Sequence, residues 1–192
     1  HQAFGTGLQN GVMFIGEAPR EDEEAEGTPL AGRVGDFMRQ VLPMVGLTQT
    51  YMTNLVLCRS AIPAVDGDNK PIIRGGMVQW RDQPPLPSHV EACSARLFQE
   101  IYKVDPLLIV SMGGKVTEFL RQRKIPMITE SGRDVHIQIP GASDVADVTA
   151  AKGVWVRKGK GKDKGTVQLP TQQNMVTYLM IPITPPSLVL TN

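Results

Sequence analysis

Short apolar runs that alternate with segments of helical spacing constrain this fold more than any other feature of the sequence. The runs at 12–15, 51–57 and 107–111 are rich in Val, Ile, Leu and Met, and each has the length of a buried strand. Residues 34–45 and 90–102 carry apolar side chains every three or four positions, as amphipathic helices do. Strands that alternate with helices predict an α/β domain in which helices cover a parallel sheet.

Two further elements and two irregular stretches complete this pattern. The spacing predicts a helix over 116–123, and the β-rich composition of 176–183 predicts a last strand. Residues 59–88 are rich in Pro and Gly, which indicates a long loop, and loops of this length are often functional. Residues 17–32 are interpreted as a second loop, with an acidic run at its centre.

Length and composition favour one domain of a cytoplasmic protein. The 192 residues suit a single domain, and because the chain has no initiator Met we expect a fragment of a longer protein. The net charge of +1 does not indicate nucleic-acid binding, so any basic footprint must be local. No apolar run is long enough to span a membrane and no signal peptide is visible, so no membrane contact is expected. Two cysteines argue against a secreted disulfide scaffold.

The most specific motif begins where the first apolar run ends. Residues 16–24 read GEAPREDEE, and residues 27–35 follow as GTPLAGRVG. Further short motifs occur at the ends of the later predicted elements: YMTNLVLCR at 51–59, PSHVEAC at 87–93, LIVSMG at 108–113 and PITPPSL at 182–188.

In this order and spacing, the motifs resemble the uracil-DNA glycosylase superfamily, closest to its iron–sulfur branch, family 4. The resemblance implies a three-layer α/β/α sandwich with a central, mainly parallel sheet of about four strands. It covers residues 1–192 as a single domain, with insertions at about 60–86 and 137–175. It also implies base excision, in which a uracil is flipped out of DNA and its bond to the sugar is cut.

The resemblance assigns roles to residues of the first two motifs. Asn54 is expected to read uracil, because its amide can donate to O4 and accept from N3–H. The turn at Gly16, Glu17 and Ala18 can aim backbone N–H groups at O2 of the base. Glu17 and Glu23 are the expected catalytic carboxylates, placed near the sugar and the attacking water.

Three positions depart from the family pattern, so weakened excision is expected. Leu30 stands where the family has the Phe that stacks on uracil, which keeps apolar contact but loses the flat face. Pro185 takes the place of a His and can neither donate to O2 nor carry charge. Arg20 replaces a Gly, although it could grip a DNA phosphate. Two alternatives stay open: a different damaged base, or a degenerate glycosylase fold that serves as a DNA- or protein-binding module of a replication or repair protein.

An iron–sulfur cluster is expected only under one condition. Family 4 holds a [4Fe–4S] cluster with four cysteines. Cys58 and Cys93 match one pair, and the other pair is not in this sequence. If the full-length protein supplies an upstream pair, these two residues are metal ligands; otherwise they are small buried hydrophobes.

The expected partner is single- or double-stranded DNA that contains uracil. The basic, Gly-rich loop at 157–165 is either a solvated hairpin tip or an arm that grips phosphates. Trp80 and Trp155 are interpreted as packing or loop anchors, with a wedge into DNA as the alternative. The predicted DNA contacts are Arg20, Ser187, Lys158, Lys160 and Lys162.

Overall fold

A six-stranded sheet forms the centre of the protein. The computed structural model describes residues 6–7, 11–140 and 175–186 of the 192. The strand order is β1-β3-β2-β8-β10-β9, with β3, β2, β8 and β10 parallel and the two edge strands antiparallel. Their bounds are β1 Thr6–Gly7, β2 Val12–Gly16, β3 Thr50–Asn54, β8 Leu108–Met112, β9 Val135–Pro140 and β10 Met175–Ile183. The predicted mainly parallel sheet is therefore confirmed, and β1 and β9 add an antiparallel strand at each edge.

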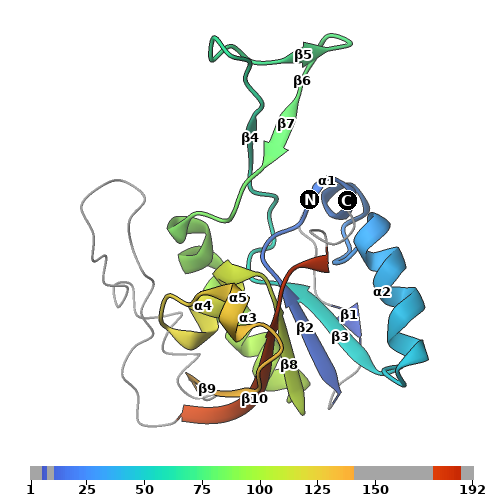
Figure 1. The fold of residues 1–192 in the computed structure, drawn as a ribbon, viewed down its shortest axis with the longest axis vertical. Coiled ribbons are helices and arrows are strands. Elements are labelled where there is room, and N and C mark those ends of the chain that lie inside the picture. Colours follow the sequence, from blue (N-terminus) through green and yellow to red (C-terminus); the bar gives the residue numbers. More distant parts are fainter. Residues whose placement is uncertain (1–5, 8–10, 141–174, 187–192) are drawn as a thin grey trace.

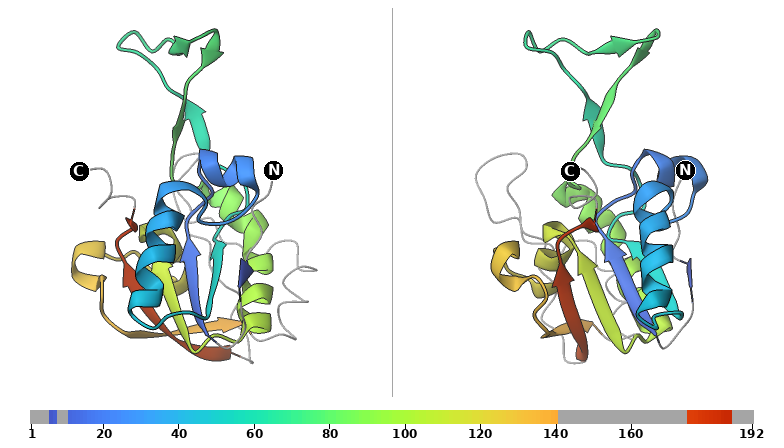
Figure 2. Two further views of the ribbon diagram at one scale, coloured as in Figure 1. Left: turned by 90° about the vertical axis from the view of Figure 1, so that its right-hand side faces the viewer. Right: turned by 45° about the vertical axis from the view of Figure 1, so that its right-hand side comes forward.

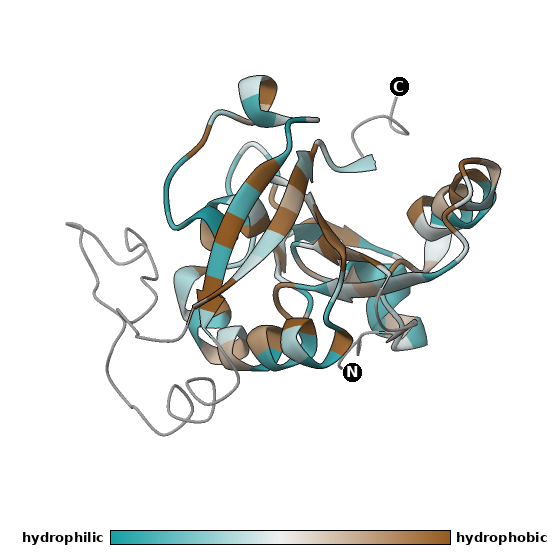
Figure 3. Cartoon of the chain, turned by 90° about the horizontal axis from the view of Figure 1, so that it is seen from below, coloured by the Kyte–Doolittle hydropathy of each residue, from teal (hydrophilic) through white to brown (hydrophobic). Residues whose placement is uncertain are grey.

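Helices cover both faces of this sheet and complete three layers (Figures 1 and 2). Successive strand residues point to opposite faces, and Figure 3 shows the resulting bands of hydrophobic and hydrophilic residues. On one face, Phe14 and Val110 pack with α2 (Gly32–Met44). On the other face, strand residues pack with α3 (Pro87–Val104) and α4 (Gly114–Arg121). A short helix, α5 (Met127–Glu130), precedes β9.

Two stretches differ locally from the sequence prediction. The predicted strand at 51–57 ends at Asn54, although Leu55, Val56 and Leu57 are all buried. These three residues lie in a bend and still bury their apolar side chains. The apolar composition therefore predicted a strand that was three residues too long. The predicted acidic loop at 17–32 contains a short helix, α1 (Glu21–Glu26).

Most of the stretch at 59–88, predicted to be a loop, forms a projecting β arm, residues 61–83 (Figure 1). Two small antiparallel ladders build it, and Gly75 and Gly76 lie between β5 and β6 with φ of 56° and 79°. Two successive residues with positive φ match a tight hairpin turn, which glycine adopts without strain. The strands of the arm are β4 Ala61–Pro63, β5 Ile73–Arg74, β6 Met77–Val78 and β7 Trp80–Asp82. Within the described ranges, no helix combines the length and the apolar character that a membrane span requires.

Candidate active site

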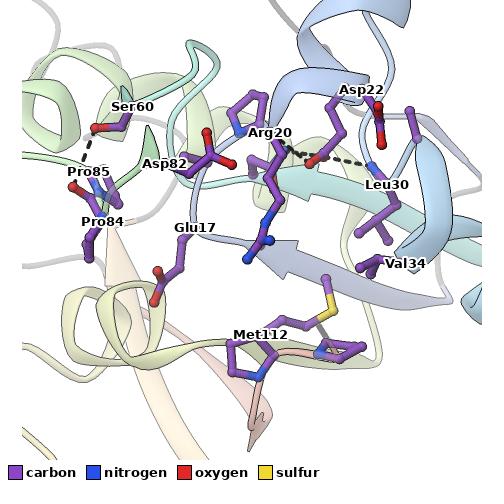
Figure 4. Close-up of a pocket in the computed structure, with 18 of the residues that line it drawn as sticks. Glu17, Arg20, Asp22, Leu30, Val34, Ser60, Asp82, Pro84, Pro85 and Met112 are labelled. Atoms are coloured by element: carbon purple, nitrogen blue, oxygen red, sulfur yellow. Dashed lines mark hydrogen bonds between the residues drawn. The ribbon is translucent and has the colours of Figure 1, made fainter. Parts of the chain in front are cut away.

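A cavity of about 380 Å³ lies at the carboxyl ends of the parallel strands (Figure 4). Gly16, Asn54 and Met112, the last residues of β2, β3 and β8, all line it. Open α/β sheets bind their ligands at this edge, because loops from neighbouring strands converge there. The sequence motifs that follow these strands are thereby brought into one site.

Glu23 is a buried carboxylate that joins three segments around this cavity. Its Oε2 atom accepts a hydrogen bond from the Arg20 backbone N–H at 3.0 Å. Its Oε1 atom accepts from the Leu30 backbone N–H at 2.8 Å and from Asn54 Nδ2 at 3.1 Å. These bonds direct the Asn54 amide nitrogen towards Glu23. The amide oxygen faces Gly16, where a Cβ atom would collide with it, so only glycine leaves room above that oxygen.

Arg96 of α3 holds the backbone on which Asn54 stands. Its Nη2 atom donates to the carbonyl oxygens of Asn54 at 2.6 Å and Leu55 at 3.0 Å, and Nη1 donates to Thr53 Oγ1 at 3.1 Å. An ion pair of 2.7 Å with Glu100 orients the guanidinium. This role of Arg96 was not predicted from the sequence, because an Arg four residues before a Glu in a helix is typical of a solvated pair.

Leu30 has an unusual backbone conformation that its neighbours hold in place. Its φ is 56°, a left-handed value that costs a non-glycine residue roughly 1 kcal/mol or more. The Leu30 N–H donates to Glu23, and its carbonyl accepts from Arg39 Nη1 at 3.2 Å. Gly35 passes so close to this carbonyl that a Cβ atom there would collide with it. The buried Leu30 side chain packs in one cluster with Met112 and gives the cavity an aliphatic wall.

Glu17 also lines the cavity, and its side chain lies against the first turn of α4. Its Oε1 atom accepts a hydrogen bond from the Lys115 backbone N–H at 2.7 Å, and Gly113, with φ of 116°, leaves space for the carboxylate. Burial raises the pKa of the Glu17 carboxyl above its usual value, although Lys115 and Arg20 act in the opposite direction. Figure 4 shows the Arg20 side chain running into the cavity, with its guanidinium drawn between Glu17 and Met112.

The remaining wall combines the end of β10 with the base of the arm. Pro185 and Pro186 line the cavity after β10, and neither has an N–H or a side-chain donor. Asp82, at the base of the arm, accepts from Arg59 Nε at 2.7 Å, and Arg59 also bonds to Glu21 of α1 at 3.2 Å. The lining residues at the base of the arm and directly beside it, none predicted from the sequence, are Ser60, Asp82, Gln83, Pro84 and Pro85.

The structure gathers most of the predicted site residues in one cavity, whereas several others lie outside the described residues. Those that line the one cavity are Gly16, Glu17, Ala18, Arg20, Glu23, Leu30, Asn54 and Pro185. Their chemical roles stay predictions. Ser187, Lys158, Lys160 and Lys162 lie outside the described residues, as does Trp155, so the predictions for them also stand as they were made.

The two cysteines do not by themselves fit a four-iron cluster. Cys58 is exposed and Cys93 is half-buried, and neither lines the cavity. A [4Fe–4S] cluster takes four thiolates, whereas the 192 residues contain two. In the part of the chain that the structure describes, no group of three or more His, Cys, Asp or Glu side chains could hold a metal ion. The predicted cluster therefore requires ligands beyond these residues.

An α/β domain with a partly polar cavity at its strand ends is thus the class that the geometry defines, and sequence comparison gives its family. The model of the uracil DNA glycosylase superfamily matches residues 4–192, and the chain belongs to that superfamily. It is 30% identical over 163 residues to the type-4 uracil-DNA glycosylase of Sulfurisphaera tokodaii, covering 83% of this chain and 57% of the relative. It is 27% identical over 111 residues to that of Archaeoglobus fulgidus, covering 57% and 46%. The predicted resemblance is confirmed, and the chain spans about half the length of these relatives.

Proposed function

We propose that this protein is a glycosylase that excises uracil from DNA. The observation that carries the proposal is the Asn54 amide, which Glu23 fixes in one orientation at the end of the cavity. Membership of the superfamily and likeness to proteins named type-4 uracil-DNA glycosylase support the same reaction. DNA is accordingly the proposed partner, and the cytoplasm the proposed location.

The fixed amide suits uracil better than cytosine. Asn54 Nδ2 uses one proton for Glu23 and has a second that can donate to O4 of a flipped base. Its Oδ1 atom lies against Gly16, whose lack of a side chain leaves room for that oxygen, and it can accept from N3–H of the base. Cytosine presents an amino donor and a bare ring nitrogen at these two positions. The Asn54 amide donor would then face a donor, and its acceptor oxygen would face an acceptor. Leu30 and Met112 then supply apolar contact to the ring.

Bond cleavage leaves negative charge on the base and positive charge on the sugar, and the cavity has a charged side chain that can offset each of them. When the bond between base and sugar breaks, its electron pair leaves with the base, and positive charge develops on the sugar. The Glu17 carboxylate can offset that positive charge or orient the attacking water. Pro185 and Pro186 cannot donate to the departing base, whereas the Arg20 guanidinium reaches into the cavity and can offset its negative charge.

Excision from defined oligonucleotides tests the proposal. Single- and double-stranded oligonucleotides that carry one uracil are incubated with excess protein, and abasic sites are scored by alkaline cleavage. We expect cleavage at uracil and none at cytosine in the same position. Binding of uracil-containing DNA without cleavage would instead favour a degenerate fold that serves as a binding module, a candidate that the proline wall supports.

An Arg20→Gln variant distinguishes the two roles proposed for Arg20. If Arg20 offsets the charge of the departing base, kcat should fall by about a hundredfold or more while KM changes little, because the contact acts in the transition state. If Arg20 grips a phosphate, as the sequence analysis predicted, KM should rise and kcat should stay the same. Gln99→Ala, an exposed change on the outside of α3, is the matched control.

A further inference from the structure

The β arm, residues 61–83, exposes a set of large apolar side chains. Trp80 is 55% exposed, Ile73 63%, Met77 70% and Val78 39%. Exposed apolar side chains gathered on a projecting element mark a contact surface more often than isolated ones do. The arm projects from the domain beyond the carboxyl ends of the parallel strands (Figures 1 and 2), and Asp82 at its base lines the cavity.

Strand geometry places Trp80 on the cavity side of this arm. Residues two apart in a strand point to the same face, so Trp80 shares its face of β7 with Asp82. Asp82 lines the cavity, and Trp80 lies one strand repeat, about 7 Å, further out. Pro63 pairs with Trp80 across the ladder and adds a flat apolar neighbour. An occupant that extends from the cavity along this face of the arm would therefore reach the indole ring.

The arm carries three exposed cations that can contact the phosphates of a nucleic acid. Lys70, Arg74 and Arg81 are exposed. The arm also carries three carboxylates: Asp68 is exposed, and Asp66 accepts from the Asp68 and Lys70 backbone N–H groups. Asp82 is paired with Arg59 at 2.7 Å. The arm thus combines an open aromatic face with exposed cations, the combination that binds single-stranded nucleic acid.

We propose that Trp80 stacks on an unpaired base next to the flipped nucleotide, so that the arm grips single-stranded DNA beside the cavity. The proposal rests on the proposed function, because that function places a nucleotide in the cavity. An indole ring needs a base whose face is open, and in a duplex the neighbouring bases cover both faces. The arm therefore favours single-stranded over double-stranded substrate.

Tryptophan fluorescence provides the test, because the chain has two tryptophans and Trp155→Phe leaves Trp80 alone. An oligonucleotide without uracil should quench Trp80 when it is single-stranded and much less when it is duplex. Fluorescence anisotropy of a labelled oligonucleotide gives the affinities of the variants. Trp80→Leu should weaken single-strand binding by about tenfold, the scale of base–aromatic stacking, whereas Trp80→Phe should restore most of the affinity. Gln99→Ala, an exposed change on the outside of α3 and away from the arm, should have little effect.

The outcomes separate this proposal from the proposed function. If Trp80 is not quenched and Trp80→Leu binds single-stranded DNA normally, the stacking role is wrong, even where uracil excision occurs. If Trp80→Leu and Trp80→Phe weaken binding equally, stacking is also wrong. If Trp80 is quenched but no uracil is released, the proposed function falls, and only the stacking of Trp80 on single-stranded DNA stands. Thermal melts followed by circular dichroism identify any variant that has lost its fold.

Discussion

The two walls of the cavity differ in how firmly they are held and in what they can donate. On the β2–β3 side, Glu23 bonds to three donors from three segments, and Arg96 holds the backbone beneath Asn54. On the β10 side, Pro185 and Pro186 offer no donor at all. Under the proposed function, the first wall would read the base, whereas the two prolines of the second wall would give little help to a departing anion. Recognition and chemistry can therefore be separated in this protein by changing one wall at a time.

The largest effect is expected from the wall that reads the base. Asn54→Ala removes both proposed contacts to uracil and should lower excision by about a hundred- to a thousandfold. The fold should survive, because the amide lies at a cavity and not within the packed core. Single-turnover excision measures the loss, with Gln99→Ala as the exposed amide control. An unchanged rate would remove Asn54 from the site.

A smaller loss of rate is expected when the hydrogen bond that orients the Asn54 amide is removed. Glu23→Gln places an NH₂ group where one carboxylate oxygen accepts, so at least one of the three N–H donors loses its partner. The free energy of unfolding should fall by about 1–3 kcal/mol, and the preference for uracil over cytosine should narrow. A purely structural role for Glu23 would lower the melting temperature and leave that preference intact. Glu26→Gln, an exposed change in the same helix, is the control.

The smallest effect concerns pH and stability at Glu17. Burial raises the pKa of this carboxyl in the folded protein, so the folded state holds the proton more tightly than the unfolded state. The free energy of unfolding should therefore fall as pH rises from the unfolded pKa through the folded pKa. Glu17→Gln removes this loss and should melt at a slightly higher temperature at neutral pH, with no difference in strong acid. Melts at the two pH values measure it, and lower stability of the variant at neutral pH would contradict the burial argument.

The pH dependence of uracil excision should also report the raised pKa of Glu17. If the charged Glu17 carboxylate acts in the reaction, activity falls on acidification with a midpoint above that of an ordinary glutamate. A rate that stays constant through this range would assign the pH dependence to another group.

The parts predicted from the sequence are those that depend on local pattern. Apolar runs gave the parallel strands, and the motif glycines correspond to close approaches, as at Gly16 and Gly35. The orientation of the Asn54 side chain could not be predicted from the sequence, because it depends on the hydrogen bond to Glu23. Only the tertiary fold decides that Glu23 is buried while Glu21 and Glu26 of the same acidic run are exposed. The arm was missed because its strands are short and carry no alternating apolar pattern against a core.

The most direct test of the two-wall account is to add a donor to the weak wall. Pro185→His should raise the single-turnover rate of uracil excision by about tenfold or more, since a new donor would face the departing base. The same change in an Asn54→Ala background should give no comparable gain, because the base would no longer be held for it. A folded Pro185→His variant with an unchanged rate, or an equal gain in both backgrounds, would contradict the account.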